Sequence, residues 1–432
     1  MTSANSAKQF QEIQKVEVSL DRQLVRQGGG SQRNLRLQLT AGASPLGKER
    51  PPVRVGFAVD RSGSMGGGKL ELASLAVIEA MDLLSDRDEF NVVFFDDAVN
   101  TAVAQTRASG AKRAEARILC QRVQPGGSTN LSGGWAQSCA ELGAAHQPGS
   151  LDLCILLTDG QANQGETDPS VLCTHSQQMR QLGIVTTCIG IGDGFAEDLL
   201  KGMADAADGR FYFARDAAQL RAMMATEVGE ALEVTAPGVA LEITPRGRGR
   251  LQALGSFRNH WTGKALRIEL GDLCSGQFID TAVQILCPDG LVGEELFFDV
   301  ALLGAEGQAL WPVQTAVLRY ETDDQVKRQP RDRSVDQLVA QHHADRVRME
   351  AVGLNRRGDY TAAGLVLTKV AERIAGYATG DEKLEELVRE LRADASRYEQ
   401  VMDEYARKMD YAQSHNRSKT RLSDGSSTRA RG

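Results

Sequence analysis

The sequence predicts an α/β fold with a parallel sheet, inserted in a β-sandwich and followed by a helical region. From Val53 to Glu230, apolar runs of strand length alternate with amphipathic stretches, which implies a parallel sheet with helices on both faces. From Val239 to Tyr320, short β segments follow one another with turn signals and no helices between them, as in a sandwich. Beyond residue 333, apolar residues recur at helical spacing.

The N-terminal segment contributes two strands that do not belong to the parallel sheet. Lys15–Val25 and Arg33–Thr40 alternate apolar and polar residues, which is the period of half-exposed strands. A linker with Pro45, Pro51 and Pro52 follows. We expect both strands to join the sandwich that continues after the α/β segment.

Within the α/β segment, the strands are apolar enough to be buried on both faces of a parallel sheet. We expect them at Val53–Val59, Phe90–Asp96, Leu151–Leu157, Ile184–Ile191 and Arg210–Phe213. The helices are expected at Lys69–Leu84, Ser109–Val123, Leu131–Leu142, Pro169–Leu182, Ala196–Ala206 and Ala217–Glu230.

The rest of the chain is expected to form short strands and then helices. The strands are predicted at Val239–Thr244, Leu251–Phe257, Ala265–Leu270, Phe278–Cys287, Leu296–Leu303 and Val313–Tyr320. The helices are predicted at Val335–Arg356, Tyr360–Ala375 and Asp381–Tyr411. The apolar stripe of the last helix favours packing within a helical hairpin over a coiled coil with a partner.

These patterns divide the chain into six segments. They are a disordered start at 1–14, sandwich strands at 15–50, the α/β domain at 51–232, the rest of the sandwich at 233–322, a helical domain at 333–412 and a disordered tail at 413–432.

Composition excludes some functions. The net charge of -7 argues against nucleic-acid binding, which needs a basic face. The first residues do not resemble a secretory signal, and no apolar run is long enough to span a membrane. The cysteines number seven and are irregularly spaced, which favours buried reduced thiols over a disulfide framework. We therefore expect a cytoplasmic protein.

Oxygen-bearing side chains gather where predicted parallel strands end. Asp60, Ser62 and Ser64 follow the first strand, Thr129 lies in a glycine-rich loop before a helix, and Asp159 follows a later strand. In open α/β sheets, ligands bind at the carboxyl ends of the strands. Carboxylate and hydroxyl oxygens suit Mg²⁺, and also Mn²⁺ or Ca²⁺.

The pattern D-x-S-x-S at Asp60, Ser62 and Ser64, then Thr129, then Asp159, resembles the metal-ion-dependent adhesion site (MIDAS) of von Willebrand factor type A (VWA) domains. The resemblance covers roughly residues 53–228. It implies a Rossmann-like domain in which these five residues hold a divalent cation, with one coordination position open to an Asp or Glu of a protein partner. It also implies a non-enzymatic scaffold or co-chaperone of the bacterial intracellular type, with an AAA+ ATPase as a candidate partner.

The motif and the function also have other interpretations. By itself, D-x-S-x-S equally fits a helix N-cap with turn residues. The alternative function is a metal-dependent phosphoester hydrolase, although no D-x-D-x-T motif is present. A third is secreted adhesion, against which the odd number of cysteines weighs.

Several further motifs favour structural roles. Gly66–Gly68 lacks the Gly-Lys-Ser/Thr ending of a phosphate-binding loop, and the glycines at 190, 192 and 194 fit a tight turn. His342 and His343 are adjacent on a predicted helix and are expected to form a surface pair, not a metal site. The remaining candidates are Asp96, Asp97 and Asp193, which could add acidity near the metal, and Trp135, which we expect in the core.

Overall fold

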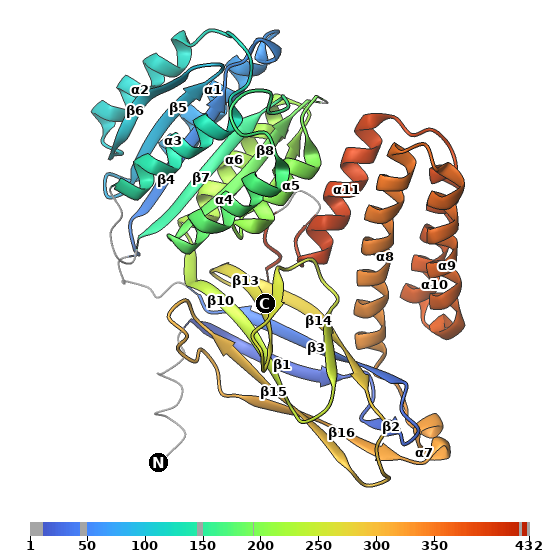
Figure 1. The fold of residues 1–432 in the computed structure, drawn as a ribbon. Helices are drawn as coiled ribbons and strands as arrows, with labels where there is room; N and C mark the ends of the chain where they lie inside the picture. Colours follow the sequence, from blue (N-terminus) through green and yellow to red (C-terminus); the bar gives the residue numbers. More distant parts are fainter. Residues whose placement is uncertain (1–11, 44–49, 145–149, 193, 423–425, 430–432) are drawn as a thin grey trace, which may run out of the picture. The chain divides into compact units, whose positions relative to one another are not determined.

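A computed structural model describes residues 12–43, 50–144, 150–192, 194–422 and 426–429 (Figure 1). The chain divides into two compact units. Ser44–Val234 form the first, which we call the α/β unit. The second, the sandwich–helix unit, combines Met1–Ala43 with Thr235–Ser423 and Ser427–Gly432.

The α/β unit is built on a six-stranded sheet with the order β6-β5-β4-β7-β8-β9. The strands are β4 Val53–Asp60, β5 Glu89–Phe95, β6 Val99–Arg107, β7 Leu151–Thr158, β8 Ile184–Ile191 and β9 Phe211–Ala214. Every neighbouring pair is parallel except β5 and β6. The predicted fold class is therefore confirmed.

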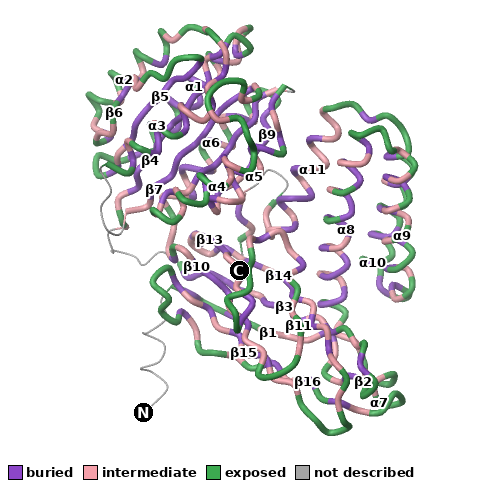
Figure 2. Tube along the Cα trace, viewed as in Figure 1, coloured by how far each residue is buried: buried purple, intermediate pink, exposed green. Residues whose placement is uncertain are grey.

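Six helices cover both faces of this sheet (Figure 1). They are α1 Lys69–Asp82, α2 Gly110–Arg122, α3 Leu131–Ala144, α4 Pro169–Gln181, α5 Glu197–Ala206 and α6 Ala217–Ala231. Alternate residues of β4, including Val55 and Phe57, share a core cluster with α1, α2 and α6. On the other face, Gly56 makes room for the hydroxyl of Ser138 in α3. Burial on both faces explains why β4 carries no exposed residue (Figure 2).

The edge strand β6 was not predicted from the sequence. It runs antiparallel to β5 and contains a single buried residue, Val103. A strand at the edge of a sheet packs little of its surface, so its side chains can be polar. Its sequence, VNTAVAQTR, therefore lacks the apolar run that identified the central strands.

The sandwich consists of two sheets whose inner faces share one hydrophobic core. The first has the order β1 Ile13–Leu20, β3 Ser31–Ala41, β14 Phe278–Cys287 and β11 Arg250–Ala253. The second has the order β12 Asn259–Trp261, β13 Leu266–Cys274, β10 Val234–Arg246, β15 Glu295–Leu303, β16 Gln314–Glu321 and β2 Leu24–Arg26.

The N-terminal segment belongs to this sandwich, as the sequence predicts, but the single strand expected at Lys15–Val25 is divided into β1 and β2, which lie in different sheets. Strand β3 lies between β1 and β14 and pairs antiparallel with both. The short strand β2 pairs in parallel with β16 at the edge of the second sheet. In the order of the chain, the α/β unit is thus inserted between β3 and β10.

Four helices form the C-terminal bundle: α8 Arg333–Arg356, α9 Tyr360–Ala378, α10 Glu382–Tyr398 and α11 Glu404–Ser418. A short helix, α7 Asp323–Arg328, precedes them. The third predicted helix, Asp381–Tyr411, is divided in the structure. After α10 the chain leaves helical conformation, and Asp403 begins α11 by accepting a hydrogen bond from the backbone N–H of Ala406.

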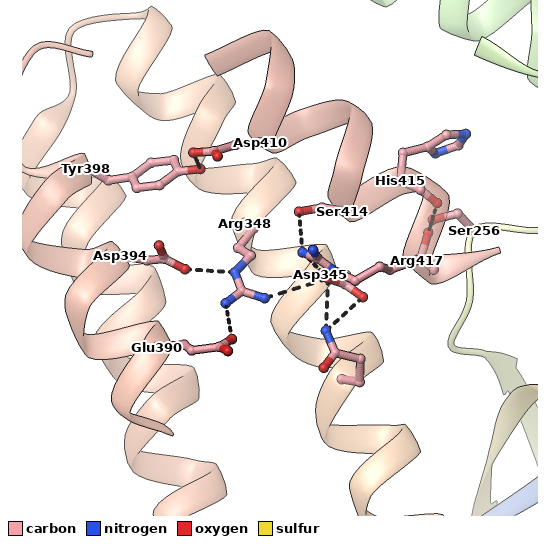
Figure 3. A network of polar contacts seen from close by, with 12 residues as sticks. Ser256, Asp345, Arg348, Glu390, Asp394, Tyr398, Asp410, Ser414, His415 and Arg417 are labelled. Carbon is pink, nitrogen blue, oxygen red and sulfur yellow. Dashed lines mark hydrogen bonds and ion pairs between the residues drawn. The ribbon is translucent and has the colours of Figure 1, made fainter. Parts of the chain in front are cut away.

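The disorder predicted from residue 413 is wrong for the end of α11. Arg417 pairs with the buried carboxylate of Asp345 at 2.9 Å, and Asp345 also contacts Arg348 (Figure 3). Beyond the helix, the hydroxyl of Thr420 donates to the carbonyl oxygen of Asp280 in β14 at 2.7 Å. A polar composition suggested a solvated tail, but these polar groups find partners inside the unit. Residues 423–425 and 430–432 lie outside the described residues, as do residues 1–11 of the predicted disordered start.

The prediction of a surface histidine pair is also wrong, because His342 is only 3% exposed and His343 is partly buried. Helix α8 packs against the first sheet of the sandwich, and Val335 and Val339 meet Leu254 and Ala282 there. Within the described residues, neither ring nitrogen of His342 has a hydrogen-bond partner. Burial, with His343 and Arg346 nearby, lowers the pKa of His342 from 6.5 to about 4.

We expect this histidine to make the sandwich–helix unit acid-sensitive. Between pH 6.5 and 4, the unfolded chain binds a proton at this position and the folded chain does not. Stability is therefore lost as the pH falls, by up to about 3 kcal/mol for a shift of this size. Urea denaturation at pH 7 and pH 4.5 should show a smaller loss in His342→Leu than in the wild type. The exposed His260, changed to Gln, is the control, and equal losses in all three proteins would contradict the assignment.

Candidate metal-binding site

The five residues of the predicted metal site lie on three loops at the carboxyl end of the central strands. Asp60 ends β4, and Asp159 follows β7. Ser62 and Ser64 lie in the turn before α1, where Gly63–Met65 form one 3-10 turn. Thr129 comes from the loop before α3. Because β4 and β7 are parallel neighbours, their carboxyl ends meet at one edge of the sheet.

Backbone hydrogen bonds join the turn that carries Ser62 and Ser64 to the loop that carries Thr129. The N–H of Gly63 donates to the carbonyl oxygen of Gly127 at 3.0 Å, and the N–H of Gly126 donates to that of Arg61 at 2.7 Å. Gly126 and Gly127 also accommodate two acidic side chains. A Cβ on Gly126 would lie 2.3 Å from Asp96 Oδ2, and one on Gly127 would lie 2.0 Å from Asp97 Oδ1. The glycines therefore let the Thr129 loop lie close to Asp96 and Asp97, which directly follow the end of β5.

A chain of hydrogen bonds connects four of the five residues. The backbone N–H of Ser62 donates to Asp60 Oδ1 at 2.7 Å. The hydroxyl oxygens of Ser62 and Ser64 lie 3.1 Å apart. The hydroxyl of Ser64 then donates to Asp159 Oδ1 at 2.7 Å.

Thr129 joins the group from its own loop. A Cβ projecting from Gly160 would lie 3.3 Å from Thr129 Oγ1, 3.6 Å from Ser64 Oγ and 3.8 Å from Asp60 Oδ2. Side-chain oxygens from the Asp60–Ser64 segment and from the Thr129 loop thus lie around one point beside Gly160, in the loop after β7. The backbone N–H of Thr129 donates to Asn163 Oδ1 at 2.7 Å, which anchors this loop to the loop after β7. The structure therefore brings all five predicted residues together.

The donor set fits a hard divalent cation. Every side chain that converges offers oxygen, and Mg²⁺ prefers oxygen ligands. Asp60 is completely buried, and burial raises its pKa, with the nearby charge of Asp159 adding to the rise; hydrogen bonds from Thr158 and Ser62 oppose it. A cation at this point would offset both the burial and the repulsion between the two carboxylates.

Two residues that contact the site were not singled out from the sequence. The hydroxyl of Thr158 donates to Asp60 Oδ2. The ammonium of Lys69 donates to Asp159 Oδ2 and, at 3.1 Å, to the carbonyl oxygen of Ser64. The sequence signal for Lys69 is its place as the first residue of a predicted helix after three glycines.

The remaining residues that the sequence analysis considered are not among the five that come together. Asp96 is buried and pairs with Arg61 at 3.1 Å, while Asp97 is exposed. Trp135 is 1% exposed and its Nε1 donates to Thr186, so the prediction that it lies in the core is confirmed. Gly192 has a φ of +67°, in agreement with a tight turn. Asp193 lies outside the described residues.

Comparison with known proteins identifies the family of the α/β unit. Residues 55–226 match the family model described as von Willebrand factor type A domain. The human inter-alpha-trypsin inhibitor heavy chain H4 is 32% identical over 155 residues, which are 34% of this chain and 17% of the human protein. The heavy chain H3 of Mesocricetus auratus is 27% identical over 167 residues, 37% of this chain and 19% of that protein. Both matches therefore span less than a fifth of the relative's length.

Two solved structures share the fold over most of the chain. A von Willebrand factor type A protein from Catenulispora acidiphila has a TM-score of 0.73 at 18% identity, covering 97% of this chain and 98% of that one. The ArnB paralog VWA2 from Sulfolobus acidocaldarius has a TM-score of 0.57 at 18% identity, covering 88% and 98%. At these identities the likeness shows the fold alone.

Proposed function

We propose that the von Willebrand factor type A domain formed by residues 55–226 binds a divalent cation and, through it, an acidic side chain of a protein partner. VWA domains typically mediate protein–protein interactions. The metal dependence and the acidic partner residue are our inference from the site. The observation that carries the proposal is the approach of Thr129 to Ser64 and Asp60 beside Gly160, which brings three separate segments of the chain together.

Each residue of the site has a distinct task in this proposal. The hydroxyls of Ser62, Ser64 and Thr129 would hold the ion directly or through water. Asp60 and Asp159 would supply negative charge and accept hydrogen bonds from neighbouring groups. When bound, Mg²⁺ supplies a Lewis-acidic centre that a partner carboxylate can complete, because it takes about six oxygen ligands. The exposed position of Ser64 supports access from solvent on that side.

We further propose a scaffold or co-chaperone role in a cytoplasmic assembly, with an AAA+ ATPase as one candidate partner. Mg²⁺ is the proposed ion. All seven cysteines are free in the structure, which supports a reducing compartment. Within the described residues, no helix has both the length and the apolar character needed to cross a membrane. The alternative of a phosphoester hydrolase finds no support in the comparisons.

The decisive experiment is a side-by-side affinity purification of the wild type and Asp159→Ala, with mass spectrometry of what differs. In Mg²⁺, the wild type should recover proteins that Asp159→Ala does not, and a chelator should remove the same proteins from the wild type. Asp82→Ala, which removes an exposed carboxylate of α1 in the same unit, is the matched control. Recovery that is indifferent to both the variant and the chelator would reject the metal bridge.

Replacing Lys69 with Met should strengthen cation binding by about tenfold. The Lys69 ammonium contacts Asp159, so its positive charge repels a cation at the site and competes for the same carboxylate. Titration with Mn²⁺ by calorimetry measures the effect. Lys112→Met, on the exposed surface of α2, controls for the loss of one positive charge. An unchanged or weaker affinity in Lys69→Met would show that Lys69 does not oppose the ion.

A further inference from the structure

A polar cavity lies in the sandwich–helix unit, where residues of helices α8 and α9 and of the first sheet of the sandwich line it. Its volume is about 330 Å³, which is within the range of small-molecule sites. The sheet contributes three glutamines from three adjacent strands: Gln32 of β3, Gln284 of β14 and Gln252 of β11. Gln284 and Gln252 are paired in register, so their carboxamides lie side by side on one face.

The helices contribute positive charge to the same cavity. Arg346 comes from α8 and Arg373 from α9. The guanidinium of Arg346 donates from Nη2 to the carbonyl oxygens of Leu254 at 3.1 Å and Ala253 at 3.5 Å, which holds it against the end of β11. His343 lines the same cavity, near both arginines. Burial, and then the charges of Arg373 and Arg346, lower its pKa to about 4, so the imidazole is neutral at pH 7.

The charges of the cavity therefore do not cancel. Two guanidiniums are present against one carboxylate, that of Glu350 on α8. The glutamine amides and the neutral imidazole add hydrogen-bond donors without charge. Arginine guanidiniums are suited to oxyanions, because their N–H groups match the spacing of phosphate and carboxylate oxygens. Two guanidiniums together with several amides favour a phosphate group over a carboxylate, because a phosphate offers more acceptor oxygens.

We propose that this cavity binds the phosphate monoester of a small hydroxylated molecule. Arg346 and Arg373 would hold the phosphate. The carboxylate of Glu350 would accept a hydrogen bond from a ligand hydroxyl. Leu254, Val347 and Val370 line the remaining wall and would pack against the carbon skeleton, so that a bare phosphate ion would leave part of the site unfilled. A ligand that bridges α8, α9 and the sheet would also stabilise the contact between the bundle and the sandwich.

Calorimetric titration of the full chain with glycerol 3-phosphate tests the proposal, with inorganic phosphate and succinate as parallel arms. We expect saturable binding of glycerol 3-phosphate at one site per chain. Inorganic phosphate should bind more weakly and succinate more weakly still. All titrations are made at one ionic strength without divalent ions, and Asp159→Ala should bind as the wild type does, which separates this site from the metal site.

The arginine variants identify the site. Arg373→Gln should weaken glycerol 3-phosphate binding by about tenfold, the effect of one charge-assisted hydrogen bond. Arg346→Gln should do the same, but it also removes bonds to the sheet, so the exposed Arg373 gives the cleaner measurement. Arg389→Gln, on the exposed face of α10, should leave binding unchanged. Absence of saturable binding, equal affinity in Arg373→Gln, or succinate binding as tightly as the phosphate ester would each overturn the proposal.

Discussion

Replacing Asp60 with Asn is expected to lower the affinity for Mg²⁺ or Mn²⁺ by about a hundredfold or more, since even outer residues of metal sites contribute ten- to a hundredfold. The substitution keeps the shape of the side chain and an oxygen that can accept the 2.7 Å hydrogen bond from the N–H of Ser62. It removes the negative charge that a cation would neutralise. The unit should therefore stay folded while it loses the ion, and with it the partner.

Calorimetric titration with Mn²⁺ measures this effect, and Asp96→Asn is the matched control. Asp96 is also a buried carboxylate at the same edge of the sheet, but it pairs with Arg61 and is not among the five converging residues. We expect its variant to bind Mn²⁺ within a few-fold of the wild type. If Asp60→Asn binds Mn²⁺ as tightly as the Asp96 variant, the five-residue site is not the metal site.

The second large effect concerns the start of β4, the strand that ends at Asp60. Arg54, at the start of β4, is 1% exposed and pairs at 3.2 Å with both Asp152 of β7 and Glu89 of β5. Its guanidinium also donates to the carbonyl oxygen of Leu142. Arg54→Met should destabilise the α/β unit by about 3 to 5 kcal/mol, because it leaves the carboxylate of Asp152 buried without its cation.

Urea denaturation can report this unit alone. The chain has three tryptophans, and Trp135 is the one within the α/β unit. In a background in which Trp261 and Trp311 are replaced by Phe, fluorescence follows Trp135 alone. The midpoint should fall strongly for Arg54→Met and recover in part when Asp152→Asn is added, because the second change removes the buried negative charge that Arg54 neutralises. An unchanged midpoint in Arg54→Met would show that the buried ion pair adds nothing to stability.

Much of this architecture could be read from local patterns. The central strands are continuous apolar runs because both faces of the sheet are covered, and the same requirement makes them recognisable. In the proposed metal site, Asp60 and Asp159 could be found because strand ends carry them, and parallel strands bring their carboxyl ends to one edge. Strand β6 could not be found in this way, because an edge strand has little apolar surface to reveal it.

Local patterns in the sequence predict the α/β fold and the sandwich strands on either side of it, and the resemblance to the MIDAS pattern adds the five oxygen-bearing residues Asp60, Ser62, Ser64, Thr129 and Asp159. The fold and the strands follow from spacing within short stretches of chain, whereas Thr129 and Asp159 lie far from Asp60 in the sequence and were grouped with it by that resemblance. The three-dimensional structure was needed to find the contact of Lys69 with Asp159, the burial of His342 and the pairing of Arg417 with Asp345. The physical reason is that burial and ion pairing depend on what distant segments pack against a residue, and neighbours in sequence do not reveal this.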